Sequence, residues 1–352
     1  MGAVVAIAPT PVAVAQPAPP FEVVASGLLN PRGLTFGPDG TLYVAEAGVG
    51  GPGPCQPGPE GGEVCFGATG GVTAISPGVQ RRVLDNMPSI AGEGGFGAAG
   101  PHDVGTRGPQ LFASIGLGGN LAFRAGFGSA ASLLGHLVRA NGNTTRFRSV
   151  ADLAAFEEQN DPDGAGPDSN PYGMAVNGGR VIVADAGGND LLSVRTSGVI
   201  DVEAVFPDRL FPLPFPPFTE VPTQAVPTGV TIGPDGAAYV GQLTGFPFPV
   251  GGARVYRVAN GQTTVYASGF TNIIDVAFGP DGTLYVLEFA TNSLLDPDSP
   301  GALWAVAPDG SKDLVASEGL VAPGGVAVDA DGQVFVTNFS VTPFGQVVIV
   351  PT

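Results

Sequence analysis

Cationic side chains are scarce in this 352-residue sequence, which contains one lysine, Lys312, and two histidines against 31 acidic residues. The formal net charge of −17 predicts a surface that repels nucleic acid and anionic membranes, so we expect neither as a partner. Long hydrophobic runs are also missing, since none reaches the roughly 20 residues that a membrane-spanning helix needs. We therefore expect no membrane span, and a monomer.

Cysteine is almost absent: Cys55 and Cys65 lie in the stretch GVGGPGPCQPGPEGGEVCFG. This loop supplies too few cysteines and histidines for a zinc site. A local disulfide is the preferred interpretation, and a reactive dithiol is the alternative. Closing so short a loop would stabilise the fold by about 2–3 kcal/mol. A disulfide also indicates an oxidising compartment.

The first 20 residues, MGAVVAIAPTPVAVAQPAPP, contain small apolar side chains and no basic residue. Their apolar run ends in Ala-Val-Ala-Gln (residues 13–16), which is similar to the cleavage site of a signal peptide. Pro9 and Pro11 interrupt the apolar run, so we interpret residues 1–20 as a signal-peptide remnant or flexible N-terminus. Together with the expected disulfide, this segment predicts a secreted or cell-envelope protein.

Glycine and proline are abundant, with 56 and 35 copies. They separate short apolar runs such as GLTF, TLYVAE and VIVAD, a pattern typical of turns between β-strands. The length alone would allow two domains, but no stretch of sequence has the character of a linker. We therefore expect residues 21–352 to form one all-β domain.

The nonapeptide FGPDGTLYV occurs twice, as Phe36–Val44 and as Phe278–Val286. Related units, of which the second is the most divergent, each predict two strands joined by a tight glycine-containing turn. A further hairpin between successive units gives four strands per unit, and six such units predict a six-bladed β-propeller. The units begin at Gly33, Asp103, Gly173, Gly229, Asp275 and Gly325.

The sixth unit ends one strand short at Thr352. The missing strand is expected at the other end of the chain, because FEVVASGLLNP (residues 21–31) resembles the outermost strands of units four and five. The N-terminal strand should therefore close the last blade and remove its open edge.

Connections between strands divide by length between the two faces of the expected ring. Turns that join the first strand to the second, and the third to the fourth, are short and lie on one face. The long segments all belong to the other face: 47–70, 90–101, 116–133, 150–171, 206–227, 243–251 and 289–300. Long loops are often functional, so we expect this face to bind a small molecule or a protein partner. The alternative is that a propeller simply tolerates insertions there.

Two of these loops are rich in proline and phenylalanine: FPDRLFPLPFPPFTEVP and TGFPFPVGG. Their aromatic residues would either pack together as a lid over the tunnel mouth or form an exposed apolar patch for a hydrophobic ligand or partner. The residues concerned are Phe206, Phe211, Phe215, Phe218, Phe246 and Phe248.

Two sets of positions should surround the tunnel on the long-loop face. The second strands of the six units end at Glu46, Ile115, Asp185, Gln242, Glu288 and Asn338. The residues just before the innermost strands are Arg32, His102, Tyr172, Thr228, Ile274 and Gly324. We predict ligand contacts from the polar members Arg32, Glu46, Tyr172, Asp185, Gln242 and Asn338. The alternative is that these groups cap backbone amides or hold ordered water.

An enzyme is the rival hypothesis, either a lactonase-like hydrolase or an isomerase with its site at the tunnel mouth. Asp103 and Asp275 replace the usual glycine in units three apart, so they should face each other across the axis. A carboxylate facing a tunnel is able to act as a base or bind metal. With His102 and Glu288 they form the candidate catalytic set, whereas His136 should be structural, within a third strand.

Acidic residues are closely spaced in NDPDGAGPDSNPYG. Its D-x-D-G start is typical of calcium loops, but no glutamate follows at the twelfth position, which excludes an EF-hand. Calcium bound in another way is a possible cofactor; otherwise these side chains cap turns through Asx hydrogen bonds. The candidate ligands are Asp161, Asp163, Asp168 and Asn170, and residues 149–160 before them predict a short helix that starts with a Ser-x-x-Asp signal.

The segments DLAAFEEQNDPDG and DSNPYGMAV, followed by VIVADAGGNDLL, resemble the ScyD/ScyE family, and the likeness runs from about Phe21 to the C-terminus. The GPDG-x-LYVAD-type units are similar, more loosely, to NHL-type and SMP-30/gluconolactonase-like propellers. The resemblance implies an exported propeller without an established reaction.

Gluconolactonase-like enzymes hold a divalent metal with Glu, Asn and Asp at the tunnel top. This sequence has none of these residue types just before its innermost strands, which argues against a metal-dependent lactonase. Strictosidine synthase-like hydrolases rely on a tunnel glutamate, whose role Glu46 or Glu288 would imitate. We therefore favour a secreted, non-enzymatic binding propeller.

Overall fold

The computed structural model describes residues 21–59, 61–141 and 145–352. The segment interpreted as a signal-peptide remnant, residues 1–20, lies outside the described residues. Within them, the chain folds into six antiparallel four-stranded blades, and one blade carries an additional strand. Among these residues no helix is long and apolar enough to cross a bilayer.

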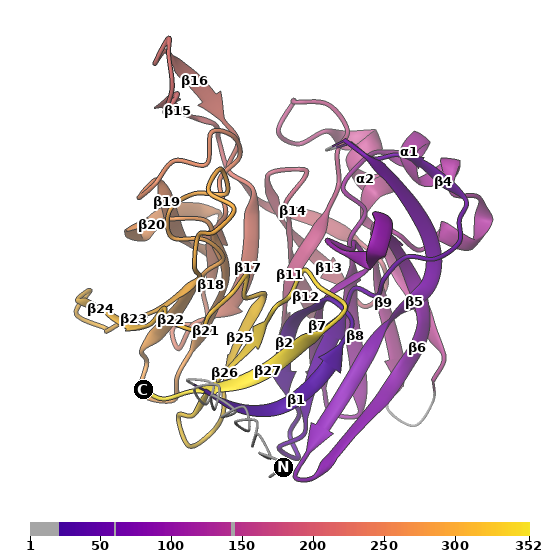
Figure 1. Cartoon of the computed structure of the whole chain (residues 1–352), viewed down its shortest axis with the longest axis horizontal. Coiled ribbons are helices and arrows are strands. Elements are labelled where there is room, and N and C mark those ends of the chain that lie inside the picture. Colours follow the sequence, from indigo (N-terminus) through magenta and orange to yellow (C-terminus); the bar gives the residue numbers. More distant parts are fainter. Residues whose placement is uncertain (1–20, 60, 142–144) are drawn as a thin grey trace, which may run out of the picture.

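The strands of each blade run from the axis outward in chain order, except that β1 is the outermost strand of the last blade (Figure 1). Blades one to three comprise β2 (Pro31–Phe36), β3 (Leu42–Glu46), β5 (Glu63–Ser76) and β6 (Val79–Ala91); β7 (Pro101–Arg107), β8 (Gln110–Ile115), β9 (His136–Asn141) and β10 (Phe147–Asp152); and β11 (Pro171–Asn177), β12 (Arg180–Asp185), β13 (Asp190–Arg195) and β14 (Ile200–Val205). Blades four to six comprise β17 (Pro227–Ile232), β18 (Ala238–Gln242), β19 (Ala253–Ala259) and β20 (Gln262–Phe270); β21 (Ile273–Phe278), β22 (Leu284–Glu288), β23 (Ala302–Val306) and β24 (Lys312–Ala316); and β25 (Gly325–Val328), β26 (Val334–Asn338), β27 (Gly345–Val350) and β1 (Glu22–Leu28).

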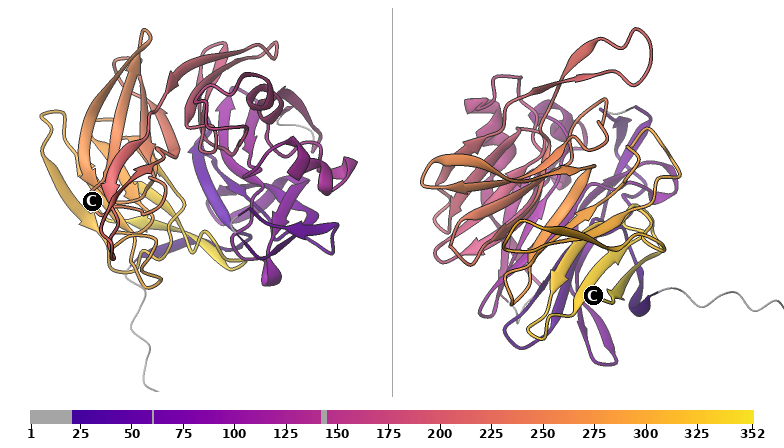
Figure 2. Two further views of the ribbon diagram at one scale, coloured as in Figure 1. Left: turned by 90° about the horizontal axis from the view of Figure 1, so that it is seen from above. Right: turned by 90° about the vertical axis from the view of Figure 1, so that its left-hand side faces the viewer.

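The innermost strands close a ring, because each contacts the next in the order β2, β7, β11, β17, β21, β25 and back to β2. Viewed from above, the blades follow the chain around a common axis (Figure 2, left). β1 pairs antiparallel with β27, from Glu22 opposite Ile349 to Leu28 opposite Gly345. The predicted six-bladed propeller, and its closure by the N-terminal strand, are confirmed.

The repeated nonapeptide forms the same turn in blades one and five. Gly37 N–H donates to Thr41 O (2.7 Å), and Gly279 N–H donates to Thr283 O (2.8 Å). In each copy the aspartate accepts a hydrogen bond from the amide two residues later, and the following glycine has a positive φ, 80° at Gly40 and 86° at Gly282. Such a φ strains any residue with a Cβ, so the geometry of the turn explains why the repeated GPDG sequence ends in glycine.

The long connections on the opposite face carry short elements of their own. These are β4 (Cys55–Pro57), η1 (Glu93–Gly95), α1 (Leu121–Gly126), η2 (Ser129–Ala131), α2 (Leu153–Asn160) and the hairpin of β15 (Arg209–Pro212) and β16 (Glu220–Thr223). Two stretches expected as loops, within 47–70 and 90–101, are partly strand. There β5 and β6 extend beyond the blade, with Phe66 opposite Ile90 and Cys65 opposite Ala91. Phe66 and Ile90 join the hydrophobic core, and this contact stabilises the extension.

The helix expected over 149–160 begins later than predicted. Residues up to Asp152 pair with β9, where Asp152 lies opposite His136, so they form the outer strand β10. α2 starts at Leu153, and Asp152 is its N-cap, accepting a hydrogen bond from Ala155 N–H at 3.0 Å. Pairing across the sheet thus takes precedence over the Ser-x-x-Asp signal at Ser149. His136 lies in the third strand of blade two, as predicted.

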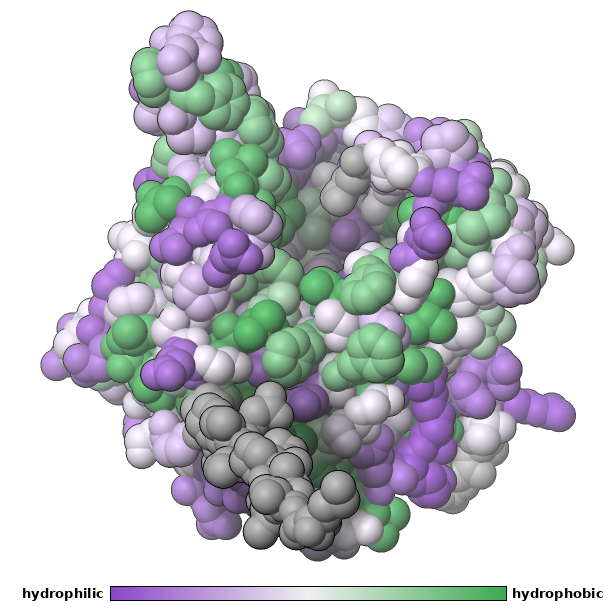
Figure 3. All heavy atoms as spheres, viewed as in Figure 1, coloured by the Kyte–Doolittle hydropathy of each residue, from purple (hydrophilic) through white to green (hydrophobic). Residues whose placement is uncertain are grey.

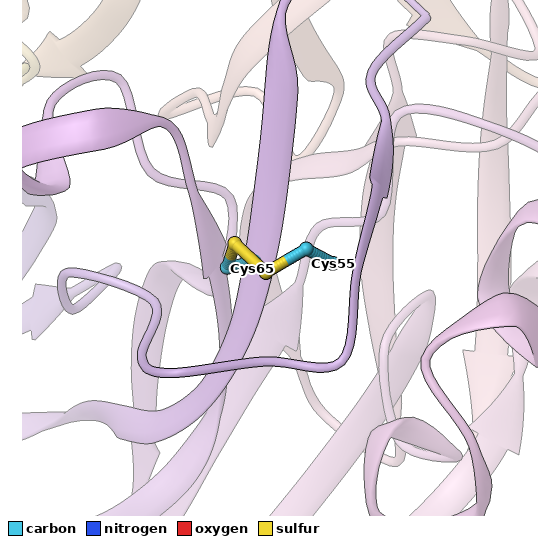
Figure 4. Close-up of a disulfide and its surroundings, with 2 residues drawn as sticks. All are labelled: Cys55 and Cys65. Carbon is cyan, nitrogen blue, oxygen red and sulfur yellow. A yellow bond between two sulfur atoms is a disulfide. The ribbon is translucent and has the colours of Figure 1, made fainter.

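The predicted disulfide joins Cys55 on β4 to Cys65 on β5 (Figure 4). The two residues are direct partners in the β4–β5 ladder, and the bond covers a sequence separation of 10 residues. It fastens the loop that follows β4 to the extended part of β5.

Replacing both cysteines by serine should lower the free energy of unfolding by about 2–3 kcal/mol, because the unfolded chain gains the freedom of the opened loop. Urea denaturation with and without a reducing agent measures this. Reductant should destabilise the native protein by the same amount and leave the double variant unchanged. Equal stability of oxidised and reduced protein would contradict the prediction.

The proline- and phenylalanine-rich segments form an arm rather than a lid. Phe206 is buried against Tyr256, with 5.0 Å between ring centroids, and anchors the base of the arm. Phe218 is 61% exposed. Phe215 and Phe246 are also exposed, and their ring centroids lie 6.3 Å apart. The β15–β16 hairpin stands clear of the body with hydrophobic residues along it (Figure 3). Of the two alternatives, the structure has the exposed apolar patch.

Candidate functional site

A cavity of about 1020 Å³ opens on the long-loop face, above the inner ends of the blades. Its floor is made by residues that occupy the second position of an inner strand: Arg32 of β2, His102 of β7, Tyr172 of β11 and Ile274 of β21. Its walls are supplied by the long connections and are mainly glycine and apolar side chains, including Phe96, Leu117, Phe123, Leu243 and Phe289. The propeller therefore places a few polar groups beneath an apolar chamber, as is common for small-molecule sites.

The ring of residues one position further along the inner strands lies directly beneath this floor. Four of its members are glycines and two are Asp103 and Asp275. A Cβ on Gly33 would lie 2.0 Å from Asp103 Oδ1, and a Cβ on Gly229 would lie 2.3 Å from Asp275 Oδ1. The two carboxylates thus occupy the space beside Gly33 and Gly229, which a Cβ at either glycine would fill. A second cavity of about 350 Å³ lies below, lined by both aspartates and the lower halves of the inner strands.

Arg32 brings a positive charge to the floor of the upper cavity. Its side chain is only 7% exposed; one Nη donates to Ala98 O at 2.8 Å, and Nε has no hydrogen-bond partner among the described residues. The ion pairs between described residues do not include Arg32. A buried guanidinium without a carboxylate partner is costly, so this group favours an anion.

His102 is uncharged at neutral pH. Burial, and then the nearby charge of Arg32, lower its pKa to about 3. Its Nδ1 lies 3.2 Å from Pro171 O, and because a carbonyl oxygen only accepts, Nδ1 carries the proton. Nε2 is then left with a lone pair. The ring packs against Tyr172, with centroids 4.7 Å apart.

Tyr172 presents a buried hydroxyl that has no hydrogen-bond partner among the described residues. Burial raises its pKa, Arg32 opposes this, and Asp275 and Asp103 add to the rise, so the hydroxyl stays protonated and able to donate. Asn170 completes the polar group at the floor, and its Oδ1 accepts from Leu117 N–H at 3.2 Å.

The polar residues at the ends of the second strands have a different environment. Four of them accept a hydrogen bond from a backbone amide in the segment that leads into the inner strand of their own blade. These are Leu29 N–H to Glu46 (2.7 Å), Asn170 N–H to Asp185 (2.6 Å), Thr271 N–H to Glu288 (2.6 Å) and Val321 N–H to Asn338 (2.8 Å). Glu46 also pairs with Arg82 at 3.0 Å. Gln242 is equally buried, and none of the five is among the residues that line the upper cavity.

The four candidate catalytic residues are therefore not gathered around one point. His102 lines the upper cavity, whereas Asp103 and Asp275 line the lower one. Each aspartate accepts two backbone hydrogen bonds, one within its strand and one from the next blade: Met174 N–H to Asp103 (2.7 Å) and Val326 N–H to Asp275 (2.8 Å). Burial raises the pKa of both; the charge of Asp275 raises that of Asp103 further, and the pKa of Asp275 is about 7.

The acidic loop after α2 lies away from the axis, beside blade three. Asp161 and Asp163 converge there with Glu157 of α2, a residue that the sequence pattern did not single out. Burial, followed by the charges of Asp185 and the loop aspartates, raises the pKa of Glu157 to about 8. Asn170, another predicted calcium ligand, turns its side chain toward Leu117 instead. The sequence did contain a signal for Glu157: it precedes Asp161 by four residues, a spacing that places two side chains on the same face of a helix.

The apolar residues of the cavity walls were also missed from the sequence. Phe96, Phe123 and Phe289 lie on connections whose course depends on packing between blades. A single aromatic residue in a loop carries no periodic signal, so only the finished fold brings these side chains together.

Comparisons with known proteins support the fold class. No protein-family model matches the chain, and no curated protein matches it; the ScyD/ScyE resemblance therefore stays a prediction. Solved structures with a similar fold include one described as a candidate gluconolactonase, with a TM-score of 0.52 and 12% identity over 95% of this chain and 93% of that one. Regucalcin, described as a calcium-binding protein from Agrobacterium tumefaciens, has a TM-score of 0.53 and 10% sequence identity, over 95% of this chain and 96% of that one. A structure described as a candidate glucose dehydrogenase from Thermus thermophilus has a TM-score of 0.51 and 16% sequence identity, over 95% of this chain and 100% of that one. At such identities the likeness is to the fold of gluconolactonase-like propellers alone.

Proposed function

We propose that this propeller binds a small organic anion, a carboxylate with an apolar body, in the cavity on the long-loop face. The observation that carries the proposal is the pair of unpartnered donors at the cavity floor, Arg32 Nε and the Tyr172 hydroxyl. Both are buried beneath walls that are mostly apolar. Unsatisfied buried donors cost roughly 1–3 kcal/mol each, and a ligand carboxylate would satisfy both.

The charges around the cavity agree with an anionic ligand. Among the described residues that line it, the only acidic ones are Glu63 and Glu93, which belong to the wall segments. The positive charge of Arg32 therefore has no carboxylate competing for it at the floor. Neutral His102 supplies an acceptor beside it, for a ligand hydroxyl or amide. The cavity volume of about 1020 Å³ suits a ligand of small-molecule size.

The proposal predicts that aromatic and aliphatic carboxylates raise the melting temperature, while their methyl esters do not. Arg32→Gln should weaken carboxylate binding by about 100-fold, because hydrogen bonds to a charged group contribute roughly 1.5–3 kcal/mol. Tyr172→Phe should weaken it by about 5–10-fold, for the loss of one neutral hydrogen bond. Thermal shift screening followed by calorimetric titration measures both effects.

Arg148→Gln is the matched control, since Arg148 is exposed on β10 and removal of its charge should leave binding unchanged. The proposal fails if carboxylates and esters bind alike, or if Arg32→Gln binds as tightly as the native protein.

A lactonase-like hydrolase is the second candidate, and one observation favours it. His102, with its free lone pair, packs against Tyr172, whose hydroxyl is protonated and unpartnered, so a base and an acid lie side by side at the floor. Including lactones in the same screen distinguishes the two: acid release by the native protein that is lost in His102→Asn would make the site catalytic. Lactone binding without acid release would leave it a binding site.

A further inference from the structure

Five acidic side chains surround the point where the loop after α2 meets blade three. Glu157 lies on α2, Asp161 caps its C-terminal end with a positive φ of 41°, and Asp163 follows two residues later. Asp185 and Asp190 face them from the β12–β13 connection, where their Cα atoms are direct partners across the ladder. The elements are labelled in Figure 1.

Three of these carboxylates converge. Glu157, Asp161 and Asp163 each offer an oxygen, and the three oxygens lie within 4.8 Å of one another. Like charges at this distance repel strongly, so the arrangement is unfavourable without a cation. The loop nevertheless holds them there through internal bonds: Gly166 N–H donates to Asp161 Oδ1 at 3.1 Å, and Ala165 N–H to Asp163 Oδ1 at 2.8 Å.

Glu157 provides an independent observation that points to a ligand at this place. The residue is only 2% exposed, its Oε1 has no hydrogen-bond partner among the described residues, and its carboxylate is one of the three that converge. An orphaned, buried carboxylate oxygen costs several kcal/mol unless it is neutralised or paired.

Asp190 adds a second unsatisfied carboxylate beside the first. It is fully buried, and neither of its oxygens has a partner among the described residues. The ion pairs between described residues include none of Glu157, Asp161, Asp163 and Asp190. The described part of the chain thus gathers negative charge here, and no ion pair within it brings a cationic side chain to these four carboxylates.

We propose that Glu157, Asp161 and Asp163 bind one calcium ion, with Asp190 adding charge from the neighbouring strand. The side-chain ligands in this cluster are all carboxylate oxygens. Such hard ligands favour calcium over zinc, because zinc sites use histidine and cysteine. Magnesium demands a stricter octahedral shell and keeps most of its water, so it should bind more weakly to a loop of this kind.

The ion would fasten the loop 161–170 to blade three. Asp163 Oδ2 already accepts from Asn189 Nδ2 at 2.9 Å, and Ser169 Oγ donates to Asp185 at 2.6 Å. The loop ends at Asn170, which lines the upper cavity. Calcium would therefore hold in place the loop that carries Asn170 to the cavity, without contacting a molecule bound in the cavity.

Calorimetric titration of the full chain with calcium chloride, after treatment with EDTA and desalting, tests the proposal. We expect one calcium ion per chain, a melting temperature that rises with calcium concentration, and weaker binding of magnesium. Asp163→Asn and Glu157→Gln should each weaken calcium binding at least tenfold. Glu157→Gln should also raise the melting temperature of the calcium-free protein, because a neutral amide of similar size replaces a buried carboxyl that lies beside other acidic groups. Replacing a glutamate that served only the packing would lower it.

The chain contains a matched control. Asp296-Pro297-Asp298 repeats the Asp161-Pro162-Asp163 tripeptide in blade five, where Asp298 is exposed and the described residues hold no such acidic cluster. Asp298→Asn should bind calcium like the native protein. The proposal is overturned if the native protein takes up no calcium at millimolar concentration. It is equally overturned if Asp163→Asn and Asp298→Asn affect binding equally, which would mean adsorption to acidic surface.

Discussion

A chain that begins at residue 30, without β1, is expected to lose its cooperative fold at room temperature. β1 is the fourth strand of the last blade, and Leu28, 1% exposed, packs in the core between the first and last blades. Its removal leaves β27 as an open edge and takes away the link that closes the ring. Circular dichroism and urea denaturation would show a broad, early transition in place of a single one.

Two single substitutions in β1 distinguish the loss of its buried contacts from a nonspecific effect of changing the strand. Leu28→Ala should cost about 2–5 kcal/mol, as for other buried leucines. Val23→Ala, on the same strand but 39% exposed, should change stability by no more than about 0.5 kcal/mol. A synthetic peptide of residues 21–29, added to the truncated chain, should pair with β27 and restore the transition. A truncated chain as stable as the full one would show that the ring holds without this strand.

Stability should decrease as pH rises from about 4 to 8, and Asp275→Asn should flatten this dependence. The pKa of Asp275 is about 7 in the folded protein, against an ordinary value of 3.8, because burial disfavours the charged carboxylate. A carboxyl with a raised pKa takes up a proton on folding, so its contribution is fully present below pH 4 and is lost as pH passes 7. The loss is on the order of 3–4 kcal/mol.

The asparagine variant should be less stable than the native protein at pH 5. Both oxygens of Asp275 accept backbone hydrogen bonds, and an amide nitrogen replaces one acceptor, at a cost of roughly 1–3 kcal/mol. By pH 8 the difference should vanish or reverse. Asp281→Asn, in the exposed GPDG turn of the same blade, should keep the native pH dependence, since its pKa is lowered by the hydrogen bond from Thr283. Equal slopes for Asp275→Asn and the native protein would assign the pH dependence to other groups.

The fold was predictable because each blade repeats one local pattern. Two apolar runs joined by Gly-Pro-Asp-Gly form a hairpin through turn geometry and alternation alone, and neither depends on distant residues. Counting the units gave the number of blades, and the strand missing from the last unit matched the surplus strand at the N-terminus. The cysteine pair was equally local, since both residues belong to one short loop.

The site was only partly predictable, because its residues meet across blades. Arg32, His102 and Tyr172 were found because they hold equivalent places in three units, so the symmetry of the repeat predicted their meeting. The same symmetry could not tell Glu46 or Asp185 from them. Those side chains turn to amides of the segment that enters their own blade, and that segment has no repeat pattern.

Local sequence thus specifies the strands, the turns, the closure of the last blade by β1, and the disulfide. Each depends on residues close together in the chain or on a pattern repeated six times. The chamber, the separation of His102 from Asp103, and the meeting of Glu157 with Asp161 and Asp163 depend on how blades and loops pack. Burial creates their chemistry: an uncharged histidine, an unpaired guanidinium and orphaned carboxylates exist only where the folded chain excludes water.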